Sequence, residues 1–453
     1  MGVELNSGSS RKLYIRTFGC QMNEYDSLRV RRLLAARGYV VVDDIGRADV
    51  VFLNTCSVRG KAEQKVYSFL GSLRRFKESK PNLKIITGGC VAQQLGEKLL
   101  DRFDHLDIVI GTRAVNSVGQ LLQQALESGG RLACLPEEEK PDSQSGGPGE
   151  AEINQSPGAV TAPVTIMQGC DNYCSYCIVP YVRGPERSRP AAQILEEVRA
   201  LEACGVSEVL LLGQNVNSYG KGLEQSITFD ELLKRIEAQT GIARIRFTTS
   251  HPRDLTDELM LCFARMDSLC KHLHLPVQAG SDRVLARMNR GYTVAGYVEK
   301  IRRLRTICPE IGLSSDVIVG FPGETVEDFK KTMELLDEVR FDNLFSFCYS
   351  DRPNTRAAAF ADKVEKGEAA RRLLELQALQ ADISAGKNLA EVGSIREVLV
   401  EGPSRASNGQ MTGRTTHNRI VNFQAPLSSK GQIVGVKIAC AYSHSLKGDI
   451  VAK

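Results

Sequence analysis

The sequence has no long apolar run. No stretch reaches the ~18 consecutive apolar residues that a membrane-spanning helix requires. Residues 1–11 are polar and do not resemble a secretory signal peptide. The charge is nearly balanced as well, with 58 Lys and Arg against 54 Asp and Glu, a formal net charge of +4. We therefore expect a cytoplasmic protein that has no contact with a membrane.

The length and the cysteine content agree with a multi-domain enzyme. A chain of 453 residues exceeds what one hydrophobic core usually supports, which suggests about three domains. Hydrophobic residues make up 42% and charged residues 25%, as in ordinary soluble proteins. In a cytoplasmic protein the 13 cysteines are expected to bind metal or to pack in a core, since disulfides are rare in that compartment.

Three cysteines stand close together at Cys170, Cys174 and Cys177, directly after an apolar run. A structural zinc site usually has four protein ligands. Neither a fourth cysteine nor a histidine follows within the reach of a hairpin, and the nearest are Cys204 and His251. Three thiolates on one loop can instead hold three irons of a 4Fe-4S cluster and leave the fourth iron open for chemistry. We interpret this triad as a cluster site, with a zinc site as the alternative.

A second set of cysteines, Cys20, Cys56 and Cys90, is spread along the first part of the chain. Each follows a short, buried strand pattern and a turn, and helical patterns separate the strands, so this part predicts a parallel sheet. The carboxyl ends of parallel strands share one edge, where ligands bind. The three cysteines are therefore expected to converge on a second cluster with an open iron; the alternative is three buried strand-end cysteines. The strand segments are 12–20, 48–56 and 83–90, and the helices 27–37 and 61–76.

The CxxxCxxC loop resembles the cluster motif of radical S-adenosylmethionine enzymes, and the two cysteine sets together resemble the methylthiotransferases of that superfamily. These enzymes insert a CH3–S group into a C–H bond. The likeness covers essentially the whole sequence. The set Cys20, Cys56 and Cys90 matches the auxiliary cluster of the family, and the triad matches the radical cluster.

Local motifs resemble the branch of this family that methylthiolates tRNA. They are GCQMNEYDS at 19–27, NTCSVR at 54–59 and KAEQK at 61–65. The branch that modifies a ribosomal protein usually carries proline-lysine-asparagine after the first cysteine, and the threonylcarbamoyladenosine branch carries lysine-leucine-asparagine. This chain has Gln21-Met22-Asn23 there, which favours the first branch.

The resemblance implies a complete reaction. S-adenosylmethionine would bind the open iron of the radical cluster and yield a 5′-deoxyadenosyl radical, while the auxiliary cluster carries the sulfur. One S-adenosylmethionine would methylate that sulfur, and a second would supply the radical that removes hydrogen from carbon 2 of the adenine. The implied substrate is N6-isopentenyladenosine just 3′ of the anticodon, held in a tRNA anticodon stem-loop. A flavodoxin or ferredoxin is the expected electron donor, and the protein is expected to be a monomer.

Two other functions stay open from the sequence. The nearer is a methylthiotransferase that acts on threonylcarbamoyladenosine of tRNA or on an aspartate of a ribosomal protein. The farther is a non-enzymatic iron-sulfur protein that binds RNA or stores iron. The second alternative leaves two open irons without a role.

Strand and helix patterns alternate for the next part of the chain, which predicts an incomplete (β/α)6 barrel of the TIM type. Active sites of such barrels lie at the carboxyl ends of the strands. The expected strands are 163–167, 208–213, 243–248, 271–275, 312–319 and 343–348.

Polar residues that follow these strands are candidates for binding the cofactor. Gln214 follows the second strand, and Gln278 and Ser281 follow the fourth. Arg187 and Arg189 could hold a carboxylate or phosphate with a two-pronged hydrogen bond, or could belong to a solvated basic loop. Beyond the clusters, no catalytic residue is assigned.

The final segment, 395–453, alternates like the strands of a small antiparallel β-barrel. It has eight basic and three acidic residues, so its net charge of 8 − 3 = +5 holds the excess positive charge of the chain. Such a field attracts RNA phosphates, and methylthiotransferases end in an RNA-binding TRAM barrel. The fold class is thus α/β, with a Rossmann-like sheet, a partial barrel and a TRAM barrel. The expected domains are 11–135, 158–385 and 386–453, with a polar linker at 136–157.

One position departs from the family pattern. Asn354 stands where the run arginine-proline-glycine-threonine usually has glycine. Asparagine tolerates a left-handed backbone better than other non-glycine residues. We therefore expect the turn at Asn354 to keep its shape.

Overall fold

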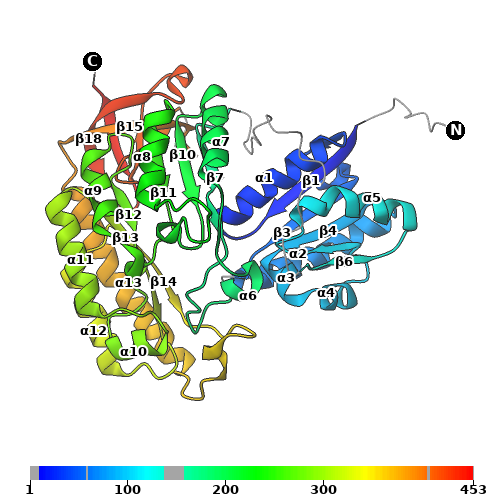
Figure 1. Ribbon diagram of the computed structural model, residues 1–453, viewed down its shortest axis with the longest axis horizontal. Helices are drawn as coiled ribbons and strands as arrows, with labels where there is room; N and C mark the ends of the chain where they lie inside the picture. The colour runs from blue at the N-terminus through cyan, green and yellow to red at the C-terminus, as the bar shows by residue number, and fades with distance from the viewer. Residues whose placement is uncertain (1–9, 58–59, 137–157, 406–408, 452–453) are drawn as a thin grey trace. The chain divides into compact units, whose positions relative to one another are not determined.

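The computed structural model describes residues 10–57, 60–136, 158–405 and 409–451 (Figure 1). All but the first residue of the predicted linker 136–157 lie outside these residues. The chain divides into two compact units. The first comprises Met1–Glu150 and Tyr181–Gly184, and the second comprises Ala151–Pro180 and Pro185–Lys453.

The first unit is built on a six-stranded sheet in the order β2-β1-β3-β4-β5-β6, in which all neighbours are parallel. The predicted parallel sheet is confirmed, with three short strands that the sequence patterns had not revealed. The strands are β1 (Arg11–Thr17), β2 (Tyr39–Val41), β3 (Val50–Thr55), β4 (Lys84–Gly89), β5 (Ile108–Ile110) and β6 (Leu132–Cys134).

Helices cover both faces of this sheet, because its central strands are apolar on both sides. In β3, Phe52 packs in one core with Leu34 and Leu122, while the next residue, Leu53, packs in the other core with Leu70. This double burial fixes the strand and so fixes where its carboxyl end lies. The helices are α1 (Gln21–Ala35), α2 (Gly60–Ser79), α3 (Cys90–Leu95), α4 (Glu97–Arg102) and α5 (Val118–Ser128).

The second unit contains the predicted partial barrel. All six strands form and pair in parallel within two sheets, β11-β10-β7 and β12-β13-β14, and a parallel bridge joins Ile245 of β11 to Leu269, just before β12. The strands are β7 (Thr161–Thr165), β10 (Glu208–Leu212), β11 (Arg244–Phe247), β12 (His272–His274), β13 (Gly312–Val319) and β14 (Asn343–Cys348).

Helices between these strands cover the outside of the barrel, as the green and yellow ribbons of Figure 1 show. They are α7 (Ala191–Ala203), α8 (Phe229–Gln239), α9 (Asp257–Arg265), α10 (Asp282–Arg287), α11 (Val294–Ile307) and α12 (Val326–Val339). Two short strands, β8 (Met167–Gln168) and β9 (Arg187–Ser188), form an antiparallel pair, and α6 spans Val179–Arg183. A long helix, α13 (Lys366–Leu389), follows the last barrel strand.

Successive side chains of the barrel strands point to opposite faces of the sheet. In β11, Ile245 and Phe247 belong to the apolar core shared with the helices, whereas Arg244 and Arg246 are buried outside that core. Successive side chains of a strand point to opposite faces, so the arginines point into the barrel. Among the described residues, no helix is both long enough and apolar enough to cross a membrane.

The C-terminal strands close into a small barrel in the order β15-β16-β17-β19-β18, drawn in orange and red in Figure 1. Four of its five strand pairs are antiparallel, and β17 and β19 pair in parallel. Its core includes Val398, Phe423 and Val436. The strands are β15 (Ile395–Pro403), β16 (Met411–Thr415), β17 (Ile420–Phe423), β18 (Ile433–Ala441) and β19 (Leu446–Ile450).

The small barrel docks on residues where the strands of the partial barrel begin. Ser207, just before β10, donates from Oγ to the Gly431 carbonyl at 2.8 Å. Arg244, the first residue of β11, donates from Nη1 to the Arg414 carbonyl at 2.6 Å. Arg419 forms an ion pair of 2.6 Å with Asp342, just before β14. The small barrel therefore covers the amino-terminal end of the partial barrel, opposite the end where active sites of this fold lie.

Candidate metal centres

Cys20, Cys56 and Cys90 lie at the carboxyl ends of three neighbouring strands. Cys20 follows β1 and immediately precedes α1, Cys56 follows β3 directly, and Cys90 follows β4 and begins α3. Because β1, β3 and β4 are adjacent and parallel, the three thiols share one edge of the sheet. The expected convergence is present, with Cys56 and Cys90 buried and Cys20 exposed.

The surroundings of these thiols change their acidity. A hydrogen bond with Cys56 is the largest of the effects that lower the pKa of Cys20 to about 6, and the charge of Arg183 adds to it. Burial raises the pKa of Cys90, and the charge of Arg183 opposes that rise. The thiolate is the form of cysteine that binds metal, so this edge favours metal binding at Cys20 in particular.

Two glycines let the strand ends approach this closely. A Cβ on Gly19, whose φ is +118°, would lie 2.2 Å from Cys56 Cβ. A Cβ on Gly89, whose φ is +93°, would lie 2.3 Å from the Thr55 carbonyl oxygen. Both positions require glycine, because φ is positive and because a Cβ atom would clash with its neighbours.

Replacing Gly19 by alanine is expected to remove the metal of this edge, because the methyl group must displace Cys56. We expect iron after reconstitution to fall from about eight to about four per chain, the content of one remaining 4Fe-4S cluster. Gly38→Ala is the matched control, since Gly38 also has a positive φ, +80°, but a Cβ there would meet nothing within 4 Å. Gly38→Ala should cost about 1 kcal/mol of stability and leave the iron count unchanged. Equal iron loss in both variants would mean that backbone strain, rather than contact with Cys56, decides the result.

A buried arginine lies beside the same thiols. Arg183, a residue of the first unit, donates from Nη2 to Asp26 Oδ2 at 2.7 Å and to Asn23 Oδ1 at 3.1 Å. Asn23 in turn donates from Nδ2 to the carbonyls of Phe18 and Thr55, on the two strand ends that precede Cys20 and Cys56. Arg183 and Asn23 therefore connect the loops that carry the cysteines.

The residues at this edge fit an iron-sulfur cluster. Three thiols provide soft ligands, and two buried polar atoms, Arg183 Nη1 and Ser57 Oγ, have no hydrogen-bond partner among the described residues. Nowhere in the described part of the chain are three His, Cys, Asp or Glu side chains arranged to hold a single metal ion. A 4Fe-4S cluster does not need that arrangement, because each cysteine binds a different iron.

The triad Cys170, Cys174 and Cys177 occupies the loop after β8, at the carboxyl end of the partial barrel. Burial raises the pKa of Cys170 to about 11 and that of Cys177 to about 12. These thiols are thus protonated near neutral pH without a metal, and metal binding would release their protons. The loop contains one strained residue, Tyr173, at a φ of +45°, as is common at functional sites.

A second buried arginine contacts this triad. Arg290 donates from Nη1 to Cys174 Sγ at 3.3 Å and from Nη2 to the Pro276 carbonyl at 2.8 Å. Its Nε donates to Tyr292 Oη at 3.0 Å. The guanidinium therefore brings a fixed positive charge and a hydrogen bond to the Cys174 sulfur, and both kinds of contact tune iron-sulfur clusters when the sulfur is a ligand.

Buried polar atoms without partners in the described residues gather after the barrel strands. They are Thr165 Oγ1 at the end of β7, Asn215 Oδ1 after β10, and Ser250 Oγ and His251 Nε2 after β11. Burial, with help from the charge of Arg290, lowers the pKa of His251 to about 2, so its ring is neutral. Buried polar groups normally have partners, and this set fits a polar ligand such as S-adenosylmethionine beside the triad.

Gln214 and Gln278, two of the residues predicted to bind the cofactor, lie at the carboxyl end of the barrel. Gln214 accepts a hydrogen bond of 2.5 Å at Oε1 from the Gly169 backbone N–H, so it holds the loop of the triad. Gln278 is buried with a φ of +72°, and its backbone pairs with β13 through Asp316 and Ile318. Their roles toward a cofactor stay predictions.

The other three predicted residues have protein partners. Arg187 lies in β9, opposite Gln168. Arg189 forms an ion pair of 2.8 Å with the buried Glu197. Ser281 donates to Asp328 Oδ1 at 2.6 Å. Their assignment to cofactor binding likewise stays a prediction.

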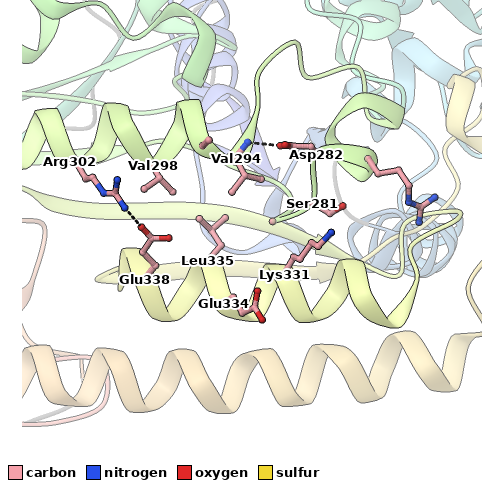
Figure 2. A pocket seen from close by; sticks show the side chains of 12 residues that line it. Ser281, Asp282, Val294, Val298, Arg302, Lys331, Glu334, Leu335 and Glu338 are labelled. Carbon is pink, nitrogen blue, oxygen red and sulfur yellow. Dashed lines mark hydrogen bonds and ion pairs between the residues drawn. The ribbon is translucent and has the colours of Figure 1, made fainter.

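A groove with a volume of about 560 Å³ lies between α11 and α12, next to the start of α10. Figure 2 shows that Val294, Val298 and Leu335 line it and that Arg302 and Glu338 form an ion pair at one end. Ser281 is among its lining residues, and no cysteine is. The groove is therefore separate from the two cysteine sets.

Three family models match the chain in succession. Residues 12–111 match the Uncharacterized protein family UPF0004, residues 164–336 the Radical SAM superfamily, and residues 389–451 the TRAM domain. A tRNA-2-methylthio-N(6)-dimethylallyladenosine synthase of Syntrophobacter fumaroxidans is 61% identical over 443 residues, 98% of this chain and 96% of the relative. The chain belongs to the tRNA-2-methylthio-N(6)-dimethylallyladenosine synthase family. The synthase of Geobacter sulfurreducens is 50% identical over 445 residues and 98% of each chain.

A solved structure shares the fold of the synthase family member. The radical S-adenosylmethionine methyltransferase TsrM from Kitasatospora setae, with cobalamin and a [4Fe-4S] cluster bound, gives a TM-score of 0.56 at 14% identity. The match covers 77% of this chain and 74% of TsrM. The radical S-adenosylmethionine fold and the terminal TRAM barrel are thus confirmed. The synthase family uses S-adenosylmethionine and 4Fe-4S clusters, as predicted.

The sequence patterns missed the residues around the cysteines. Arg183 and Arg290 carry no local signal, because each lies in a loop or short helix of no special periodicity. His251 and Asn215 were not assigned roles, and their partnerless buried atoms appear only in the folded structure. The expected turn at Asn354 is present, with a φ of +68°.

Proposed function

We propose that this protein is a tRNA methylthiotransferase that adds a methylthio group to carbon 2 of N6-isopentenyladenosine, next to the anticodon. The observation that supports it best is the pair of three-cysteine sets, each at the carboxyl edge of a parallel sheet, in a chain 61% identical to a synthase of this name over 98% of its length. The set Cys20, Cys56 and Cys90 suits sulfur delivery, and the set Cys170, Cys174 and Cys177 suits radical formation.

The side chains of this chain would hold and orient the reactants. Cys170, Cys174 and Cys177 hold the radical cluster, and the second set, Cys20, Cys56 and Cys90, holds the auxiliary cluster. When bound, these clusters and S-adenosylmethionine supply the adenosyl radical and the sulfur. The polar atoms after β7, β10 and β11 orient S-adenosylmethionine, and Gln214 keeps the loop of the triad in place.

The remaining features concern partners. The C-terminal barrel carries the excess positive charge of the chain, which favours contact with the phosphates of the anticodon stem-loop. The target adenosine must leave its stack to reach a buried radical, as enzymes that modify bases require. A flavodoxin or ferredoxin supplies electrons, and the protein works as a monomer in the cytoplasm.

The test is an anaerobic reaction with S-adenosylmethionine, a strong reductant and tRNA that contains N6-isopentenyladenosine. Nucleoside mass spectrometry should detect the 2-methylthio derivative. S-adenosylhomocysteine and 5′-deoxyadenosine should form in equal amounts, because one S-adenosylmethionine gives its methyl group and another gives the radical. Product on threonylcarbamoyladenosine instead would identify the other tRNA branch. Iron binding without cleavage of S-adenosylmethionine would point to a non-enzymatic iron-sulfur protein.

A further inference from the structure

Arg183 uses only part of its hydrogen-bonding capacity on protein. Its side chain is 3% exposed, and the Nη2 group makes the hydrogen bonds to Asp26 and Asn23. A hydrogen bond with Arg183 also acts to lower the pKa of Cys90. The Nη1 group is buried and has no hydrogen-bond partner among the described residues. A buried donor without an acceptor costs free energy. A ligand that accepts a hydrogen bond from Nη1 would remove this cost.

The guanidinium of Arg183 lies close enough to the thiols of Cys20 and Cys90 for their charges to act on it. The charges of Cys90 and Cys20 act on Arg183 together with that of Asp26. Asp26, 5% exposed, is paired with Arg183. Among the described residues, the charges that act on Arg183 are those of Asp26, Cys90 and Cys20, all negative when ionised, so the guanidinium is the positive group that favours a further anion beside these thiols.

We infer that Arg183 is the anion-binding residue of the auxiliary site, and that its Nη1 donates a hydrogen bond to an anionic sulfur species of the hydrosulfide class held beside Cys20 and Cys90. This inference rests on the proposed function, in which Cys20, Cys56 and Cys90 hold a cluster. A free anion would be repelled by the thiolates. A sulfur anion can bind the open iron and also accept a hydrogen bond from Arg183, so both contacts stabilise it.

Asp26 and Arg183 have opposite effects under this inference. Removing Arg183 takes away the donor and the positive charge. Removing the charge of Asp26 leaves Arg183 in place and less neutralised, so that it attracts an anion more strongly. A purely structural ion pair would instead make the two losses equivalent. The signs of the two effects therefore separate binding from packing.

The experiment uses the full chain with Cys170, Cys174 and Cys177 changed to alanine, so that only the auxiliary cluster remains. In this background we compare Arg183 with Arg183→Met, Arg183→Lys and Asp26→Asn. Iron per chain is measured first. Sodium sulfide is then titrated into the reduced protein, and its dissociation constant is read from the change in the electron paramagnetic resonance spectrum.

We expect Arg183→Met to weaken sulfide binding at least about tenfold, or about 1.4 kcal/mol, with about four irons retained. The dissociation constant of Arg183→Lys for sulfide should lie between those of the parent and Arg183→Met, because lysine keeps the positive charge but lacks the planar pair of guanidinium donors. Asp26→Asn should bind sulfide as tightly as the parent or more tightly. If Arg183→Met loses its iron, the inference is tested by comparing the sulfide dissociation constants of Arg183→Lys and Asp26→Asn with that of the parent.

Two results would overturn the inference. One is an unchanged dissociation constant in an iron-loaded Arg183→Met or Arg183→Lys variant. The other is a weakening in Asp26→Asn as large as that in the arginine variants. A background protein that holds no iron at all would instead contradict the proposed function, because Cys20, Cys56 and Cys90 would then hold no cluster.

Discussion

A variant in which Cys20, Cys56 and Cys90 are all alanine is expected to hold about four irons per chain after anaerobic reconstitution, where the unaltered protein holds about eight. The three thiols follow three adjacent parallel strands and share one edge, so the variant lacks the three proposed ligands of the auxiliary cluster. The triad of the second unit is untouched. The variant should therefore still cleave S-adenosylmethionine but form no methylthio product. Iron and labile sulfide per chain are the measurements.

The matched control changes three cysteines outside both sets, Cys134, Cys204 and Cys440. None of them is buried, so their replacement costs little packing, and about eight irons should remain. If the unaltered protein holds only about four irons and the first variant holds the same number, the N-terminal cysteines are structural. The protein would then be a radical enzyme with one cluster.

Replacing Arg246 by methionine is expected to destabilise the second unit by about 3–5 kcal/mol, the usual cost of leaving a buried charge without its partner. Arg246 and Glu208 are almost fully buried and pair through two hydrogen bonds, of 3.2 Å and 3.1 Å. Arg246 also donates to the carbonyls of Thr415 and Thr416 in the small barrel. Urea denaturation followed by circular dichroism measures the loss.

The double variant Arg246→Met and Glu208→Gln is the control for this effect. It removes both charges, so most of the lost stability should return, apart from about 1 kcal/mol for each hydrogen bond to the small barrel. Equal stabilities of the single and double variants would show that the hydrogen bonds to Thr415 and Thr416, rather than the unpaired carboxylate, carry the effect.

The sequence was sufficient to predict the strands that hold the two cysteine sets. The strands β1, β3 and β4 each contain neighbouring apolar residues, and the rule that parallel strands share a carboxyl edge then predicted that Cys20, Cys56 and Cys90 lie together. All six strands of the partial barrel were predicted as well, from the alternation of strand and helix patterns. Strands β2, β5 and β6 were missed; each has three residues, too few to show a periodicity, whereas the pattern that predicted the equally short β12 ran over 271–275.

The groups around the cysteines could not be predicted in the same way. Arg183 meets Asp26 across 157 positions of sequence, and Arg290 meets Cys174 across 116. Such contacts depend on the tertiary fold and leave no local pattern. Gln278 has a left-handed backbone conformation, which residues other than glycine and asparagine rarely adopt. This conformation could therefore not be predicted from the sequence.

The docking of the small barrel at the starts of the strands sets a length scale for the substrate. Strand β13 has eight residues, and at about 3.3 Å per residue it spans about 26 Å. An RNA that contacts both the small barrel and the triad must reach across that height. A folded stem-loop is long enough to reach across this height and a free nucleoside is not, so contact at both ends would require a large, structured RNA.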